Sequence, residues 1–280
     1  MTRAGLAGGG APNKDSRIKH VFTTLKAQNR AALIPFVEAY DPDRATSLAL
    51  LRGMAERGAD IIEIGMPFTD PMADGPTIQA AGLRGLQAGA TLAGLLGLVR
   101  EFRAANNHTP LVVMGYLNPI VSYGVQRFCA DAAQAGVDGL IVVDLPTEEA
   151  DLLLPDATAN GLDVIRLVAP TTSDERLPKV LSGSSGFVYY VSITGITGTR
   201  TATAADLARD IPRIRAVTDL PVAVGFGVRT PEQARIVAEH ADGAIIASAL
   251  IDKLVKEGVP AVLDDVAALA TGIRSASKAA

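Results

Sequence analysis

The feature that most constrains the fold is a unit that recurs along most of the chain. Each unit has a short run of branched apolar residues that ends in Gly, Pro or Asp, followed by a longer helical stretch. Short runs of Val, Ile and Leu are typical of parallel strands that are buried on both faces. The sequence predicts eight strands, at Ala32–Val37, Asp60–Met66, Pro110–Tyr116, Gly139–Asp144, Asp163–Ala169, Gly186–Ser192, Pro221–Phe226 and Gly243–Ala247.

The stretches between these runs predict helices, several of which end in the glycine that typically stops a helix. They lie at Arg44–Arg57, Leu92–Ala105, Val125–Ala135, Glu148–Ala159, Asp174–Leu181, Ala204–Val217 and Pro231–Glu239, with an extra helix at Ile18–Asn29. Strands that alternate with helices pair in parallel. Because eight such units fit the roughly 250 residues of one closed barrel, we expect an α/β fold, a single (βα)₈ barrel whose floor the extra helix covers.

The barrel is expected to span residues 18–270, between flexible tails at 1–17 and 271–280 that are rich in small or polar residues. The alternative is a doubly wound open sheet. That fold is disfavoured because no G-x-G-x-x-G motif follows the first predicted strand.

Composition excludes several classes of function. The net charge of -4 gives no general attraction to nucleic acid or to an anionic membrane. The single cysteine, Cys129, excludes an internal disulfide framework, and the three histidines lie too far apart in the sequence to suggest a metal site. No apolar run approaches the ~18 residues of a membrane span. We therefore expect a soluble, cytoplasmic protein without a metal site.

A carboxylate interrupts the second predicted strand. Alternation places Ile61, Glu63 and Gly65 on one face of the strand and leaves the other face wholly apolar. The apolar face suits the helix layer, so Glu63 is expected to point into the barrel mouth. Apolar surroundings would raise its pKa toward the range that is useful for proton transfer. The alternative interpretation is a structural ion pair with Arg166 on the fifth strand.

The loop after this strand, residues 67–79, is stiffened by three prolines and carries two more carboxylates. Asp70 precedes a proline, which is ordinary turn chemistry. Asp74 precedes a glycine, but it could also face Glu63 across the site. Two carboxyl groups in different environments can divide acid and base roles between them.

Three later elements match the usual phosphate site of such barrels. A Gly- and Thr-rich loop, residues 193–200, follows the sixth strand, and Gly225-Phe226-Gly227 ends the seventh. The eighth strand runs through Ala247 and Ser248 into a short predicted helix, whose N-terminal amides could approach a phosphate. Together they indicate a phosphorylated small substrate, although tight barrel turns alone would explain the glycines.

The sequence also resembles a known family. The stretch Gly58–Gln79 closely resembles the signature of the tryptophan synthase alpha chain family, and the similarity runs in order from about residue 18 to about residue 254. Further matches are Leu33-Ile-Pro-Phe36, Met114-Gly-Tyr-Leu-Asn118-Pro-Ile, Gly136-Val-Asp-Gly-Leu-Ile-Val-Val-Asp144-Leu-Pro, Ala169-Pro-Thr-Thr172, Gly195-Ile-Thr-Gly198 and Val224-Gly-Phe-Gly227.

The resemblance implies a lyase that splits indole-3-glycerol phosphate into indole and glyceraldehyde 3-phosphate. It implies that Glu63 is the acid–base group, that Asp74 holds the indole N–H, and that Tyr189 lines the pocket beside Glu63. It also implies a set of substrate contacts. Phe36, Tyr116 and Phe226 would pack around the indole, Thr197 would contact Asp74 from the closing loop, and Gly198, Gly227, Ala247 and Ser248 would contact the phosphate.

The resemblance further implies a partner. The chain itself would need no cofactor, and a beta chain that carries pyridoxal phosphate would receive the indole in an alpha2beta2 heterotetramer. Two residues depart from the family's usual pattern. Glu38 stands in a segment that usually reads Thr-Ala-Gly-Asp-Pro, and could alter the pKa of Glu63. Ala247 replaces a usual glycine, which leaves less backbone freedom.

Two other functions remain open from the sequence. The chain could be another phosphate-binding barrel enzyme, such as an indole-glycerol-phosphate synthase or a phosphoribosyl isomerase. The former is expected to carry catalytic lysines at strand ends, and the predicted strands contain none. The chain could also be a subunit that activates a beta chain without catalysis, although both Glu63 and Asp74 are present.

Overall fold

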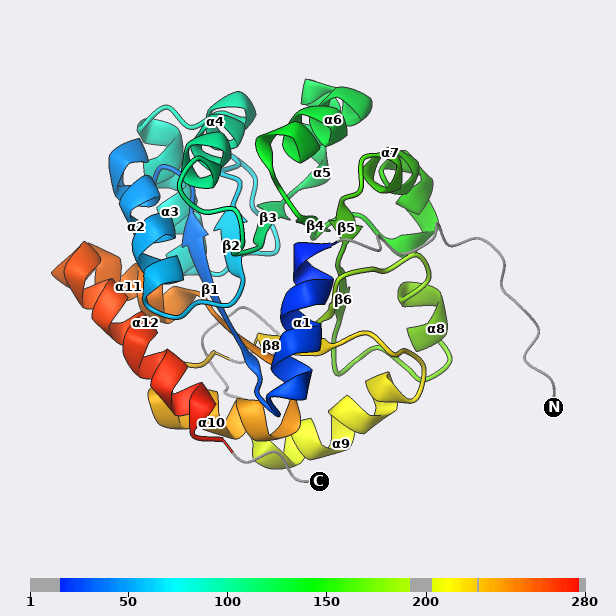
Figure 1. Cartoon of the computed structure of the whole chain (residues 1–280). Coiled ribbons are helices and arrows are strands. Elements are labelled where there is room, and N and C mark those ends of the chain that lie inside the picture. Colours follow the sequence, from blue (N-terminus) through cyan, green and yellow to red (C-terminus); the bar gives the residue numbers. More distant parts are fainter. Residues whose placement is uncertain (1–15, 192–202, 226, 277–280) are drawn as a thin grey trace.

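The computed structural model describes residues 16–191, 203–225 and 227–276. Within these ranges nine strands form one parallel sheet in the order β5-β4-β3-β2-β1-β9-β8-β7-β6, and helices surround it (Figure 1). The strands are β1 (Ala32–Glu38), β2 (Ile62–Gly65), β3 (Leu111–Gly115), β4 (Gly139–Val142), β5 (Asp163–Val164), β6 (Arg166–Val168), β7 (Val188–Val191), β8 (Val222–Gly225) and β9 (Gly243–Ile246).

All eight predicted strands are present, and the fifth is divided in two. Its first half, β5, pairs with β4, whereas its second half, β6, pairs with β7. The break falls at Ile165, whose N–H donates to Leu140 O at 3.0 Å. The two ends of the sheet therefore meet in one continuous stretch of chain, which closes the ring and confirms the barrel.

The helices follow the predicted units, with additions. They are α1 (Arg17–Ala27), α2 (Arg44–Glu56), α3 (Pro76–Gln87), α4 (Leu92–Arg103), α5 (Leu117–Tyr123), α6 (Val125–Ala135), η1 (Thr147–Leu152), α7 (Leu154–Ala159), α8 (Leu177–Val180), α9 (Ala204–Arg215), α10 (Pro231–His240), α11 (Ser248–Glu257) and α12 (Val259–Arg274). No single helix in the described ranges could span a membrane by length and composition, although α3 and α4 pass that test as a pair bent by 93°.

Two predicted helices differ from the structure: one is divided and the other is shorter. The helix expected at Glu148–Ala159 is a 3₁₀ helix, η1, followed by α7, and the break is at Leu153. Pro155 explains this break, because a proline fits the first turn of a helix but not its interior. The helix expected at Asp174–Leu181 is reduced to α8, which contains Pro178 near its start.

Side chains of alternate strand residues point to opposite sides of the barrel wall. Ile61 belongs to the inner apolar cluster, whereas Ile62 and Ile64 belong to the larger cluster between sheet and helices. Burial of both faces accounts for the nearly continuous apolar runs in the sequence. Inward-facing residues at the carboxyl ends of the strands are therefore free to form a site.

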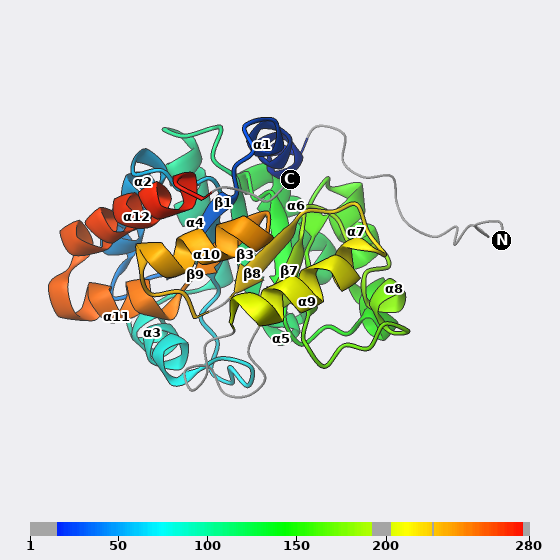
Figure 2. The same cartoon turned by 90° about the horizontal axis from the view of Figure 1, so that it is seen from below.

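Helix α1 covers the floor of the barrel, as predicted. It lies across the amino-terminal ends of the strands, whereas α3 and α5 lie at the opposite end (Figures 1 and 2). Its buried Phe22 packs on Phe187 of the barrel, with ring centroids 5.8 Å apart. Ser16 is the N-cap of α1, and α12 ends at Arg274.

Candidate active site

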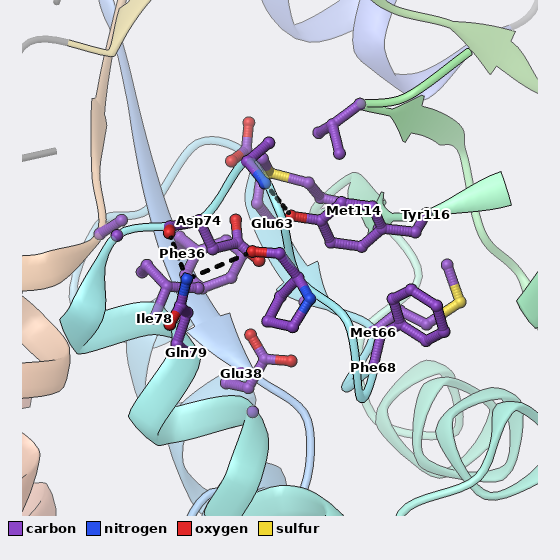
Figure 3. Close-up of a pocket in the computed structure, with 18 of the residues that line it drawn as sticks. Phe36, Glu38, Glu63, Met66, Phe68, Asp74, Ile78, Gln79, Met114 and Tyr116 are labelled. Carbon is purple, nitrogen blue, oxygen red and sulfur yellow. Dashed lines mark hydrogen bonds between the residues drawn. The ribbon is translucent and has the colours of Figure 1, made fainter. Parts of the chain in front are cut away.

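A cavity of about 240 Å³ opens at the carboxyl ends of the strands (Figure 3). Its walls are mainly apolar, and three carboxyl groups interrupt them. Seven of the residues that the sequence predicted for the site line this cavity: Phe36, Glu63, Asp74, Tyr116, Tyr189, Ala247 and Ser248. Gly227 lies outside the lining. Thr197, Gly198 and Phe226 lie outside the described residues.

Glu63 is the most deeply buried of the three acids, with 0% exposure. It faces the cavity from β2, where its register partners are Phe36 on β1 and Val112 on β3. Neither carboxyl oxygen has a hydrogen-bond partner in the described part of the chain. Burial alone raises the pKa of Glu63 to about 8, because the charged form loses its hydration without gaining a partner.

The ion pair between Glu63 and Arg166 is absent, so that alternative was wrong. Leu167 lines the cavity from β6, whereas its neighbours on that strand alternate toward the outer layer, where Val168 packs. Arg166 faces that outer layer and donates to Leu145 O at 3.1 Å. The two side chains therefore lie on opposite sides of the barrel wall. Burial lowers the pKa of Arg166 as well.

Asp74 enters the cavity on a loop that the first turn of α3 holds in place. Gln79 donates from Nε2 to Asp74 O at 2.9 Å, and the Ala73 N–H donates to the Tyr116 hydroxyl at 3.0 Å. Burial raises the pKa of Asp74, and the nearby Tyr116 hydroxyl partly opposes this rise. The loop thus places a second carboxyl group of different environment at the same cavity. Asp70 lies outside the lining, in an exposed turn, as expected.

Tyr189 reaches the cavity from β7, which stands opposite β2 in the ring. Its pKa is raised well above the usual value, first by burial and then by the negative charges of Glu63 and Asp74. A side chain at Gly225 on the adjacent strand would lie within 2.7 Å of the Tyr189 ring. Gly225 therefore gives the tyrosine room to lie against the barrel wall as a neutral hydroxyl near both acids.

Glu38 is the third carboxyl group of the cavity. Its side chain comes from the carboxyl end of β1 and is 5% exposed. Its pKa is raised well above the usual value by burial and then by the charges of Asp74 and Asp41. The charge coupling expected with Glu63 is not among the causes of the Glu63 shift, which is due to burial.

Several apolar residues of the wall were not predicted from the sequence. Met114, Val143, Leu167 and Val191 line the cavity from the ends of four strands. Strand alternation could have predicted them, because each lies two residues beyond an inward-facing residue of its strand. Phe68 and Ile78 come from the loop and α3, which no strand pattern could indicate.

The corner between β9 and α11 faces the same cavity. Ala247 precedes the first turn of α11 and Ser248 opens it, and no side chain caps this end. Ala247 O accepts from the N–H groups of Leu250 and Ile251 at 2.9 and 3.2 Å. The amides before them are at a helix N-terminus, which favours anions. Gly227, just after β8, has a φ of 67°.

The fold and the cavity together define a class of protein. It is a (βα)₈ barrel enzyme whose mouth holds a mainly apolar cavity and, in the wall of that cavity, a wholly buried carboxyl group whose pKa is raised by burial.

Comparison with known proteins narrows this class. The family model described as tryptophan synthase alpha chain matches residues 22–278. The chain is 70% identical to the tryptophan synthase alpha chain of Acidiphilium cryptum over 275 residues, which cover 95% of this chain and 100% of that one. It is 64% identical to that of Granulibacter bethesdensis over 270 residues, covering 93% and 97% of the two chains.

Solved structures agree with the sequence relatives. Tryptophan synthase subunit alpha from Legionella pneumophila superposes with a TM-score of 0.86 at 37% identity, covering 92% of this chain and 98% of that one. A tryptophan synthase structure from Mycobacterium tuberculosis gives a TM-score of 0.86 at 41% identity, with the same coverage. This chain belongs to the tryptophan synthase alpha chain family. It is a lyase of tryptophan biosynthesis that splits indole-3-glycerol phosphate into indole and glyceraldehyde 3-phosphate.

Proposed function

We propose that Glu63 is the acid–base group of this cleavage, with Asp74 and Tyr189 beside it. One observation carries the proposal: a wholly buried carboxyl group faces the cavity and has no hydrogen-bond partner among the described residues. Burying such a group costs stability, and groups of this kind are found mainly at functional sites. A pKa near 8 keeps Glu63 protonated at neutral pH, so that it can donate a proton and take one back.

The reaction needs two proton transfers. Glu63 first protonates the ring carbon that carries the glycerol group, which leaves a positive charge on the ring nitrogen. The resulting carboxylate then removes the proton of the adjacent glycerol hydroxyl. The bond between ring and glycerol breaks, its electrons return to the ring, and the former hydroxyl carbon leaves as an aldehyde. Glu63 ends protonated, ready for another cycle.

Asp74 and Tyr189 have supporting roles in this proposal. Asp74 in its ionised form accepts a hydrogen bond from the indole N–H and stabilises the positive charge that develops on that nitrogen. Tyr189 stays neutral, since its pKa is raised, and can donate from its hydroxyl near Glu63. The two acids thus differ in role because they differ in environment. Glu63 is wholly buried, whereas Asp74 lies near the Tyr116 hydroxyl.

The two ends of the substrate would occupy different walls. Phe36 and Tyr116 supply flat apolar surfaces for the indole, which supports placing the ring on that side. The α11 N-terminus at Ala247 and Ser248 supports placing the phosphate there, and Gly227 follows β8, the strand that pairs with β9. We assign Phe226 to the ring, and Thr197 and Gly198 to the loop that closes over the substrate, by the same family resemblance.

Membership in the alpha chain family implies a beta chain partner. We infer an alpha2beta2 heterotetramer in the cytoplasm, in which the beta chain carries pyridoxal phosphate and consumes the indole. Met72, which is 83% exposed in the loop before α3, and Val121, which is 52% exposed on α5, support an apolar docking surface at the mouth. Both elements lie at the end of the barrel opposite α1 (Figure 2).

The test is release of indole from indole-3-glycerol phosphate by the purified chain, with and without a beta chain. We expect Glu63→Gln to lower turnover by about 10²- to 10⁴-fold, the usual loss when a general acid–base group is removed. Binding to the beta chain should be retained. Glu148→Gln, which alters an exposed acid paired with Arg176, is the control and should keep full activity. Cleavage retained by Glu63→Gln would contradict the assigned role.

A further inference from the structure

The cavity holds one carboxyl group that the proposed reaction does not use. Glu38 lines the cavity at the end of β1 and is more than nine-tenths buried. The nearby acid on the same connection, Asp41, is fully paired, because Arg84 donates to both its carboxylate oxygens at 2.6 and 2.8 Å. Glu38 has no equivalent bond to any residue within 16–191, 203–225 or 227–276.

The position of the Glu38 carboxyl group is closely defined by its neighbours. Glu38 and Gly65 are register partners on β1 and β2. A Cβ atom at Gly65 would lie 2.2 Å from Glu38 Oε2 and 2.6 Å from Phe36 Cζ. The carboxyl group therefore occupies the space that the missing side chain of Gly65 leaves, next to the edge of the Phe36 ring.

The second oxygen points toward α3. A Cβ atom at Gly82 would lie 4.0 Å from Glu38 Oε1, and Ile78 on the same helix lines the cavity beside it. Figure 3 shows Glu38 at the cavity together with Phe36 and Ile78. Glu38 is thus a fixed polar group in an otherwise apolar wall, on the side where Phe36 offers a surface for the indole ring.

A buried carboxyl group without a partner is costly, and in most proteins a hydrogen-bond donor offsets this cost. The charged groups that act on Glu38 are Asp74 and Asp41, which are both acids and repel it. The described lining of the cavity contains no Lys, Arg or His side chain. Glu38 lines the cavity, and its oxygens, unlike those of Glu63, are not among the sealed atoms without a partner, so a donor on a molecule bound in the cavity can reach them.

Building on the proposed placement of the ring against Phe36, we propose that Glu38 is a specificity-determining residue that accepts a hydrogen bond from a hydroxyl group on the indole ring of the substrate. The chain would then process one hydroxylated indole-glycerol phosphate better than an apolar wall would allow. Because Glu38 is fixed between β2 and α3, it should favour a hydroxyl at one ring position. Sites built to bind a substrate hydroxyl discriminate strongly, since their own polar group is otherwise unpaired.

The experiment measures the reverse reaction, the condensation of an indole with glyceraldehyde 3-phosphate. This reaction forms the carbon–carbon bond and the hydroxyl group and needs no other reactant. Indole and its 4-, 5-, 6- and 7-hydroxy derivatives are compared as ratios of kcat/KM within each protein preparation. Three variants are compared. Glu38→Met keeps the length of the side chain but has no carboxyl group, and Glu38→Ala removes the side chain beyond Cβ. Glu38→Gln keeps an oxygen that can accept a hydrogen bond.

In Glu38→Met and Glu38→Ala we expect the kcat/KM of one hydroxyindole, taken relative to that of indole, to fall by about 10- to 100-fold. The same ratio for the other isomers should change little. Glu38→Gln should restore most of the ratio. Taking ratios cancels any loss of folded protein, and either apolar variant decides the question if the other does not fold. Ratios that are the same in wild type and both apolar variants for all four isomers would overturn the inference.

Failure of this inference is distinguishable from failure of the proposed site. If Glu63→Gln keeps full activity on unsubstituted indole, the proposed catalytic site is wrong. If Glu63→Gln is inactive while the Glu38 variants leave every ratio unchanged, the site stands and only the role of Glu38 is wrong.

Discussion

The floor and the mouth of the barrel both bury carboxyl groups, but they treat them differently. At the floor, Asp138 accepts from Arg17 at 2.8 Å, from Arg103 at 2.6 Å and from the Leu111 N–H at 2.8 Å. At the mouth, Glu63 and Glu38 have no such partner among the described residues. Paired acids at the floor hold the fold together, whereas unpaired acids at the mouth are available to a substrate.

Asp60 and Glu63 show the same difference within one stretch of chain. Asp60, below β2, is bound by Arg30 through two bonds of 2.7 and 2.8 Å and by the Leu33 N–H at 2.8 Å. Glu63 lies three residues further along the same chain segment, within β2, and faces the cavity. One short stretch of chain therefore carries a paired acid before β2 and an unpaired acid that faces the cavity, which agrees with the usual division between the two faces of such barrels.

The largest effect on stability is expected at the floor. Asp138→Asn should lower the free energy of unfolding by about 3–5 kcal/mol, because it leaves the buried Arg103 guanidinium without its counter-charge. Urea denaturation of the two proteins measures this change. Indole release per folded molecule should remain close to that of wild type. A loss below about 1 kcal/mol would show that the floor acids do not stabilise the barrel by pairing.

At the mouth, the free energy of unfolding of wild type is expected to fall relative to that of Glu63→Gln as pH rises. The pKa of Glu63 is about 8 in the folded chain and 4.5 as the reference value, so the folded state binds the proton more tightly. Its contribution to stability is therefore fully present below pH 4.5 and is lost as pH rises through about 8. Relative to Glu63→Gln, wild type should lose on the order of a few kcal/mol between pH 5 and pH 9.

Urea denaturation of both proteins across this pH range checks the prediction. Glu148 is the matched control, because Arg176 and Lys179 lower its pKa to about 2. Its contribution is present above the reference pKa of 4.5 and is lost only as pH falls, so Glu148→Gln should parallel wild type between pH 5 and pH 9. A difference between wild type and Glu63→Gln that stays constant with pH would mean that Glu63 is ionised throughout.

The smallest effect is expected at the edge of the floor. Ser16 donates from its hydroxyl to the buried Asp163 at 2.5 Å and also caps α1 by accepting from the Lys19 N–H. Ser16→Ala should lower the free energy of unfolding by about 1–2 kcal/mol, through loss of the cap and of one hydrogen bond. Thermal unfolding gives the measurement. An unchanged Tm would show that α1 is held by Phe22 and its apolar neighbours alone.

The barrel could be predicted because its signals are local. Runs of Val, Ile and Leu and helix-stopping glycines each depend on residues close in sequence. The inward direction of Glu63 also followed from alternation along a single strand. The predictions failed where a proline acted within a helix, as at Pro155 and Pro178, and where a strand changes its partner, as at Ile165.

The site was predicted as a set of residues but not as an arrangement. Sequence alone left Arg166 as a partner for Glu63, because it does not fix which face of the fifth strand points inward. It could not show that Tyr189 stands opposite Glu63. It also could not show that Glu38 lies over Gly65, close enough to Asp74 for that charge to raise the pKa of Glu38.

The sequence by itself determined the repeating unit, the closed barrel and the inward direction of Glu63. Only the tertiary structure decided which acids are paired, how far each one is buried from water, and which wall of the cavity carries Glu38. The reason is physical: strand and helix formation depends on neighbours along the chain, whereas the pKa of a carboxyl group depends on neighbours across the ring, which come together only when the barrel closes.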